Sequence, residues 1–217
     1  MKFNRSLISV ICALSISILP SYAQQRGIIP DLSGTTNQDN RVTVNRDAEY
    51  SDGEVHLDAR PGNGLLILKE TNFSDGRIEL DIKGKNEPQQ SFVGLAFHGV
   101  NDSTYDAVYF RPFNFKNPDR DTHSVQYIAM PKFDWYVLRQ EYPGRFENKL
   151  TTVPDPDGWF HVKIEFYYPE VKVYVNDSRD PSLTVSQISM QTQGWVGFWV
   201  GNGSDGYFRN LKIYPGQ

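Results

Sequence analysis

The sequence predicts an all-β fold in which two antiparallel sheets pack as a jelly-roll sandwich. Apolar side chains recur at every second position in most segments after residue 60, which is the period of a half-buried strand. Turn-forming clusters such as SDGE, FSDG and NDSRDP separate these segments at short intervals. No segment keeps a helical period over ten residues, so crossover helices are not expected. These three observations indicate one β-sandwich domain over residues 41–217.

The segment at 76–84 shows the alternation most clearly. Ile78, Leu80 and Ile82 point to one face, and charged side chains lie between them. We expect the apolar face to pack on the second sheet and the charged face to meet solvent. Strands are expected at residues 64–70, 76–84, 91–99, 104–112, 124–130, 135–141, 159–168, 171–177, 194–201 and 206–214.

The first 23 residues are typical of a secretory signal peptide. Lys2 and Arg5 precede an apolar run at 7–19, and Ser-Tyr-Ala ends at residue 23. We expect cleavage after Ala23 and release into a periplasm or the medium, followed by a polar leader at 24–40. No other apolar run approaches the roughly 20 residues of a membrane-spanning helix, so no membrane insertion is expected.

Composition excludes several classes of protein. Cys12 is the only cysteine and lies in the signal peptide, so a cysteine nucleophile, a thiolate zinc site and disulfides are excluded from the mature chain. Removing Lys2 and Arg5 leaves 22 − 2 = 20 basic against 26 acidic residues, a net charge of −6. An acidic chain without a basic run argues against nucleic acid or an anionic membrane as partner. The sequence indicates no particular oligomeric state.

A candidate ligand-binding face follows from strand parity. His98, Tyr109 and Arg111 fall on the face opposite the core, among the small residues Gly94, Ala96 and Ala107. An aromatic ring next to imidazole and guanidinium donors suits a sugar, which offers apolar C–H faces and many hydroxyls. The alternative is a structural pair between Arg111 and an acid such as Asp106 or Glu141.

The next expected strands extend this face. Gln126 lies on one of them, and Trp135, Arg139 and Glu141 alternate on the segment at 135–141. Trp135 is placed near the mouth of the groove, in the most aromatic and least periodic region. The predicted substrate-binding residues are thus Arg111, Tyr109, Gln126, Trp135 and Arg139. The predicted acid–base pair is His98 and Glu141, because imidazole titrates near neutral pH.

No metal or cofactor is expected. The chain has no His-x-His and no His-Glu-x-x-His, which makes a zinc site improbable. Asn202 and Asp205 lie in a glycine-rich turn that could hold calcium, but the run of acidic ligands is missing. His161 is expected on a solvated face, and neither His56 nor His123 has a partner at ligand spacing.

Five segments carry a resemblance to known proteins: FSDGRIELDIKG, FVGLAFHG, YDAVYFRP, DGWFHVKIEFYYPEVKVYVND and GWVGFWVGNGSDGYFRNLKIYP. From about Val42 to Pro215 the chain resembles the concanavalin A-like lectin/glucanase superfamily. WFHVKIEF and VKVYVND resemble a hairpin of laminin-G-like domains. GYFRNLKI is similar to the last strand of the 3-keto-disaccharide hydrolase domain family. The resemblance implies a curved jelly roll that binds its ligand across the concave sheet.

The resemblance does not extend to the family 16 glucanase motif. Glu79-Leu80-Asp81 is the nearest match, and the second glutamate of the motif is missing. A retaining glycosidase needs two carboxyl groups about 5 Å apart, so this mechanism is disfavoured. We expect an exported carbohydrate-processing protein, a glycoside hydrolase or lyase. A non-catalytic, lectin-like glycan-binding module is the alternative, and a structural domain of a surface assembly has no positive support.

Overall fold

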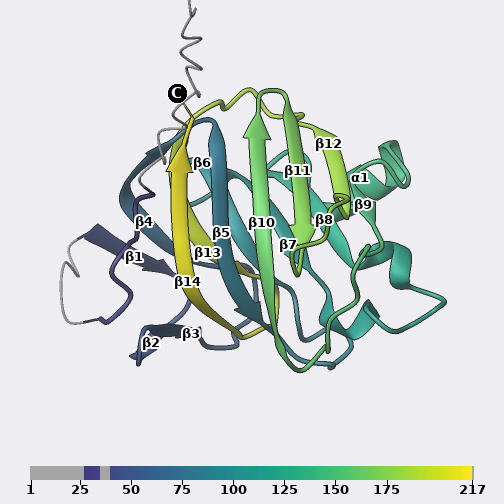
Figure 1. Cartoon of the computed structure of the whole chain (residues 1–217), viewed down its shortest axis with the longest axis horizontal. Helices are drawn as coiled ribbons and strands as arrows, with labels where there is room; N and C mark the ends of the chain where they lie inside the picture. Colours follow the sequence, from purple (N-terminus) through teal and green to yellow (C-terminus); the bar gives the residue numbers. More distant parts are fainter. Residues whose placement is uncertain (1–26, 35–39, 217) are drawn as a thin grey trace, which may run out of the picture.

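The computed structural model describes residues 27–34 and 40–216. The predicted signal peptide, with its cleavage site and Cys12, lies outside them. The described residues form fourteen strands in two antiparallel seven-stranded sheets, which Figure 1 shows stacked face to face. The predicted two-sheet jelly-roll sandwich is confirmed.

The cleft sheet, which carries the candidate site, has the order β1-β4-β13-β6-β7-β8-β9. It consists of β1 (Arg41–Val44), β4 (Gly64–Phe73), β13 (Gly194–Val200), β6 (Val93–Asn101), β7 (Thr104–Phe110), β8 (Val125–Met130) and β9 (Glu147–Asn148). The back sheet has the order β12-β11-β10-β5-β14-β3-β2. It consists of β12 (Leu183–Ser186), β11 (Glu170–Val175), β10 (Trp159–Tyr167), β5 (Gly76–Lys83), β14 (Gly206–Pro215), β3 (Glu54–Leu57) and β2 (Ala48–Ser51).

Short helical elements lie in the long connections of the cleft sheet. The β7–β8 connection contains the 3₁₀ turns η2 (Pro112–Asn114) and η3 (Asp121–His123). The β8–β9 connection contains the one α-helix of the described residues, α1 (Trp135–Glu141). Figure 1 shows α1 beside β8 and β9 at one edge of the sandwich. These connections build one wall of the candidate site.

The core lies between the two sheets and follows the predicted alternation. Ile78, Leu80 and Ile82 are completely buried, whereas the charged residues between them are half-buried on the outer face of β5. Four phenylalanine pairs join the sheets: Phe198 with Phe208 at 4.5 Å, Phe110 with Phe160 at 5.2 Å, Phe97 with Phe166 at 4.7 Å and Phe73 with Phe166 at 5.0 Å. Aromatic pairs contribute about 0.5–1.5 kcal/mol each beyond the area that they bury.

The prediction of a strand at 135–141 is wrong, because this segment is the helix α1. Asp134 caps the helix by accepting a hydrogen bond from the backbone N–H of Val137 at 2.8 Å. Arg139 in the last turn suits the negative end of the helix dipole. The capping signal was present in the sequence. However, the apolar pattern of a seven-residue helix is too short to distinguish a helical period of 3.6 residues from a strand period of 2 residues.

The predicted position of His98 on the ligand face is also wrong. His98 has a left-handed backbone conformation with φ 50, and the pairing of β6 with β7 is irregular between Phe97 and Asn101. This irregularity turns the ring into the sandwich, where it is 2 % exposed and lies 5.9 Å from the ring of Phe166. Strand parity holds only while the ladder is regular, so the expected face is lost at the bulge.

Part of the predicted leader packs on the domain. Ile28 forms a two-hydrogen-bond bridge with Ile213 of β14, and Leu32 is 6 % exposed within the core. Residues 27–34 therefore contribute to the folded unit. None of the described helices is long and apolar enough to cross a bilayer.

Candidate functional site

The floor of the site is a row of residues that crosses the cleft sheet. Gly94 on β6 pairs with Trp199 on β13 and with Tyr109 on β7. Tyr109 pairs in turn with Gln126 on β8, and Gln126 pairs with Glu147 on β9. Residues directly opposite in antiparallel strands point to the same face. An indole, a phenol, an amide and a carboxylate therefore lie side by side on the outward face.

Arg111, just after β7, organises this row. Its guanidinium lies 4.8 Å from the centre of the Tyr109 ring, and one terminal nitrogen donates to both the Tyr109 hydroxyl and Gln126 Oε1. The other terminal nitrogen donates to the backbone carbonyl of His123 at 2.9 Å. Burial lowers the pKa of Arg111 and raises that of Tyr109 to about 12. The predicted grouping of Arg111 with Tyr109 and Gln126 is present, and the terminal nitrogens of Arg111 already bind the protein.

The carboxylate beside Arg111 is Glu147, rather than Asp106 or Glu141 as the structural alternative supposed. Its Oε2 lies 3.7 Å from Nη1 of Arg111, and both side chains are about 95 % buried. A carboxylate in this position offsets part of the cost of burying the guanidinium. Arg111 therefore forms an ion pair with an acid, as the structural alternative supposed, and it also lines the cleft.

Glu147 is the centre of that charge cluster. Arg139 binds it in a bidentate manner, from Nε to Oε1 at 2.9 Å and from Nη2 to Oε2 at 2.6 Å. Nδ1 of His123 lies 2.8 Å from Oε2. Burial opposes ionisation of Glu147, but the contacts with Arg139 and His123 hold its pKa below the usual value. The carboxylate is therefore ionised at neutral pH.

Side chains above this floor enclose a cleft of about 750 Å³, within the range of small-molecule sites. Its walls are aromatic. Phe92 and Phe113 meet edge to face at 5.5 Å, and Trp135, which is 47 % exposed, lies under the guanidinium of Arg139 at 5.3 Å. Polar side chains on the rim supply further donors and acceptors: Asn63, Gln89, Asp119, Arg120, Asp134 and Asn202.

The helix α1 explains why two predicted residues reach the cleft and a third does not. Trp135 and Arg139 are four residues apart, which places them on one side of either a strand or a helix. Glu141 is six residues from Trp135, a spacing that shares a face only in a strand. Glu141 is exposed at the end of α1 and does not line the cleft.

The predicted acid–base pair is therefore not assembled in the cleft, because His98 also lies elsewhere. Its Nε2 is 2.7 Å from the carbonyl oxygen of Ser74, and its Nδ1 is 3.3 Å from the side-chain amide of Gln187. Burial lowers the pKa of His98, which favours the neutral ring. These contacts give His98 a structural role inside the sandwich.

The small residues of the cleft sheet are covered by the protein's own aromatic rings. A Cβ added at Gly94 would lie 2.7 Å from Cβ of Tyr109, so the glycine allows the tyrosine to lie flat on the sheet. Trp199 lies 4.8 Å from the Tyr109 ring and donates from Nε1 to the Tyr105 hydroxyl at 3.2 Å. These rings are themselves almost completely buried, so the outward face is not the bare sheet that the sequence suggested.

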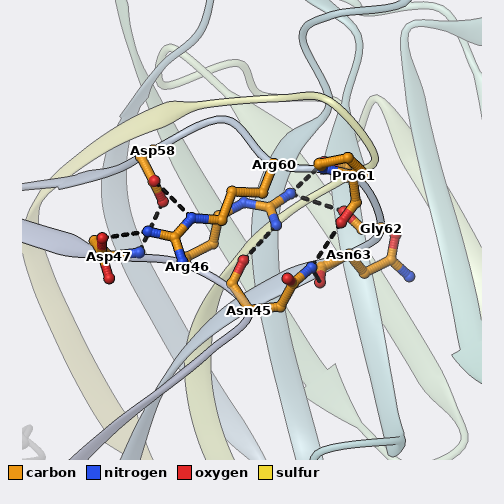
Figure 2. Close-up of polar contacts among 9 residues, drawn as sticks. Asn45, Arg46, Asp47, Asp58, Arg60, Pro61, Gly62 and Asn63 are labelled. Atoms are coloured by element: carbon orange, nitrogen blue, oxygen red, sulfur yellow. Dashed lines mark hydrogen bonds and ion pairs between the residues drawn. The ribbon is translucent and has the colours of Figure 1, made fainter.

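A buried arginine fixes the opposite rim of the cleft. Arg46, in the β1–β2 connection, is 2 % exposed and donates from Nη2 to the carbonyls of Gly62 at 2.8 Å and Gly201 at 2.9 Å. Asn45 binds the same β3–β4 loop through the carbonyls of Pro61 and Asn63, as Figure 2 shows. The loops that carry rim residues are thus tied together by side-chain donors.

Asn202 and Asp205, the residues of the calcium alternative, have protein partners. Oδ1 of Asn202 accepts from the backbone N–H of Gly62 at 2.7 Å. Asp205 lies 2.9 Å from Nζ of Lys85 and 3.6 Å from Nε2 of His56. Within the described part of the chain, no group of three His, Cys, Asp or Glu side chains is arranged to hold a metal ion.

Sequence reasoning missed His123, Glu147 and the aromatic wall formed by Phe92 and Phe113. Glu147 lies in β9, a two-residue edge strand that has no detectable period. His123 was considered only as a metal ligand and was set aside, because it has no partner at ligand spacing in the sequence. Its position in the sequence could have drawn attention to His123. It directly precedes the predicted strand at 124–130, and that strand carries the candidate residue Gln126.

The sequence model of one family, described as a 3-keto-alpha-glucoside-1,2-lyase-like domain, matches residues 30–214. The chain belongs to this family. The match confirms the resemblance to 3-keto-disaccharide hydrolase domains and covers the cleft in full. No curated protein matches the chain.

Solved structures share the fold at low sequence identity. Carbohydrate-binding module CBM66 from Bacillus subtilis has a TM-score of 0.60 and 18 % identity over 80 % of this chain and 95 % of that one. A putative glycosyl hydrolase from Parabacteroides distasonis has a TM-score of 0.57 and 13 % identity over 87 % of this chain and 99 % of that one. The VIP36 exoplasmic/lumenal domain, in a form bound to Ca²⁺ and Man3GlcNAc, has a TM-score of 0.58 and 12 % identity over 82 % of this chain and 84 % of that one.

Proposed function

We propose that this protein is an exported carbohydrate-processing protein that binds a sugar in the cleft and acts on it as a lyase or hydrolase. The observation that carries the proposal is the cleft itself, with aromatic walls around a floor of fixed polar groups. Sugars bind through stacking of their C–H faces on rings and through hydrogen bonds to hydroxyls. The family description favours a 3-keto-glucoside as the ligand. Export is supported by the predicted signal peptide.

The charges around the cleft favour an uncharged sugar. Arg139 and Arg111 are both opposed by Glu147, and the other charged residues that line the cleft are one arginine and two aspartates, Arg120, Asp119 and Asp134. An anionic sugar would have to compete with Glu147 for Arg111 and Arg139.

A lectin-like function is the second candidate. The fold is shared with a carbohydrate-binding module and with a sugar-bound lumenal domain. The contacts of Arg111 also favour a lectin-like function. Because its terminal nitrogens already donate to protein acceptors, Arg111 holds the binding surface rigid. Consumption of the bound sugar separates the two functions.

The test is isothermal titration of the purified protein with neutral α-glucosides and their 3-keto derivatives. Trp135→Ala removes an exposed ring from the cleft wall, and the affinity should fall about tenfold, corresponding to about 1.4 kcal/mol of stacking. Trp159→Ala is the matched control, because Trp159 lies under Arg209 at 4.1 Å on the outer face of the back sheet. Equal effects of the two substitutions, or no binding of any sugar, would contradict a sugar site in the cleft.

A further inference from the structure

We propose that His123 is the general base of the cleft and that Glu147 positions it. This inference rests on the proposed function, because it assigns roles for chemistry on a bound sugar. His123 ends η3 at the edge of the floor, and 36 % of its side chain is exposed. Its Nδ1 lies 2.8 Å from Oε2 of Glu147, within ion-pair distance of a protonated ring although outside the angles of a hydrogen bond. Nε2, on the other side of the ring, is then the nitrogen available to a ligand.

The imidazole is held from two directions. The backbone carbonyl of His123 accepts from Arg111 at 2.9 Å and from Nδ2 of Asn114 at 3.1 Å. On the ring side, Glu147 is itself fixed by the bidentate contact with Arg139. A catalytic group fixed in this way spends little entropy in reaching its substrate. A protonated imidazole would also be paired with a carboxylate that is already ionised.

The other acidic groups near the cleft are poor alternatives, since Asp119 is exposed to solvent on the rim. Glu147 is bound by a guanidinium and an imidazole, so it does not supply a proton. Asp134 is engaged as the cap of α1 through Val137 N–H. Glycoside hydrolysis by two carboxyl groups would need a free pair about 5–9 Å apart. A single imidazole is instead suited to removing a proton from carbon next to a carbonyl group.

For a 3-keto-glucoside the step balances without any oxidant or reductant. Nε2 of His123 takes the proton from the sugar carbon C2, which is acidic because it adjoins the ketone. The electron pair of that C–H bond forms the C1–C2 double bond, and the bond from C1 to the departing oxygen breaks. The departing oxygen takes a proton from water, and the hydroxide that remains takes the proton back from Nε2, giving an unsaturated keto sugar and an alcohol and restoring the neutral imidazole.

The first measurement is turnover of the 3-keto derivative of 4-nitrophenyl α-glucoside, followed by release of nitrophenol. His123→Asn should lower kcat about 100-fold or more, the range expected for loss of a general base, with KM changed by less than about threefold. His161→Asn is the matched control, because its Nδ1 also lies 2.8 Å from a carboxylate, that of Asp81, but on the back sheet. It should leave both constants unchanged.

A positioning role for Glu147 has its own readout. Glu147→Gln keeps the shape but removes the negative charge, so the imidazolium of His123 loses its paired carboxylate and faces only Arg111 and Arg139. The value of kcat should therefore fall about tenfold, while KM changes by less than about threefold. A purely structural role would lower the amount of folded protein without changing kcat per folded molecule.

Solvent exchange tests proton abstraction without turnover. The 3-keto form of 1,5-anhydroglucitol has no leaving group at C1, so in D₂O the wild type should exchange its C2 hydrogen, and His123→Asn should not. If the wild type binds this sugar but neither exchanges nor eliminates, the base assignment is overturned and sugar binding stands. If His123→Asn retains wild-type exchange, the base lies elsewhere. Failure of the wild type to bind any keto sugar would overturn the proposed function itself.

Discussion

Asp106 is a buried carboxyl group whose ionisation should destabilise the fold. It lies on the inward face of β7, where Oδ2 accepts from the Tyr127 hydroxyl at 2.8 Å and from Ser189 Oγ at 2.7 Å. Oδ1 has no hydrogen-bond partner. Burial is the main cause that raises the pKa from 3.8 to about 7. The substitution Asp106→Asn keeps an acceptor for both hydroxyls and removes the titration.

The direction and size of the effect follow from linkage. Between pH 3.8 and about 7 the folded state binds a proton that the unfolded state has released. The stability contributed by the neutral carboxyl is therefore complete below the unfolded-state pKa of 3.8. It is lost as the pH rises to the folded-state pKa of about 7. A difference of about three units corresponds to roughly 4 kcal/mol.

The assay is urea unfolding at several pH values, followed by tryptophan fluorescence. The free energy of unfolding of Asp106→Asn, relative to the wild type, should rise by about 4 kcal/mol between about pH 4 and pH 8. Asp52→Asn, at an exposed turn between β2 and β3, is the control and should show no such trend. Parallel curves for Asp106→Asn and the wild type would refute the claim that Asp106 is neutral in the fold near pH 6.

Two further predictions concern stability. A Cβ at Gly94 would lie 2.1 Å from the carbonyl oxygen of Val108, so Gly94→Ala should cost about 3 kcal/mol, because backbone must shift. Gly144 has φ 72 with no atom within 4 Å of an added Cβ, and Gly144→Ala should cost only about 1 kcal/mol. Arg46→Ala removes the donor of three carbonyls, those of Asn45, Gly62 and Gly201, of which the Gly201 contact is buried, and should cost about 2–4 kcal/mol while weakening sugar binding at the rim. Urea unfolding measures all three, and equal costs for the two glycine variants would contradict the packing argument.

The regular part of the fold could be predicted from the sequence because alternation is a local property. Ile78, Leu80 and Ile82 show it without interruption, and β5 is buried accordingly. Tyr109 and Arg111 were placed on the correct face for the same reason. Gln126 joined them because β8 is also regular and pairs directly with β7.

The irregular part could not be predicted, because it depends on contacts distant in sequence. His98 leaves its expected face at a bulge that a period of two does not reveal. Glu147 reaches the site only through the pairing of β9 with Gln126, and His123 only through the path of the long β7–β8 connection. These loop and edge residues lie closest to the proposed chemistry, as expected when a rigid sheet positions functional groups on its connections.

The central claim is that the cleft binds a sugar and removes a proton from it through His123. The most direct measurement is NMR of the 3-keto form of 1,5-anhydroglucitol in D₂O with the wild type, His123→Asn and His161→Asn. We predict loss of the C2 proton signal with the wild type and with His161→Asn, and its persistence with His123→Asn. Persistence of the signal with all three proteins, despite measurable binding, would contradict the claim of catalysis and leave a lectin-like protein.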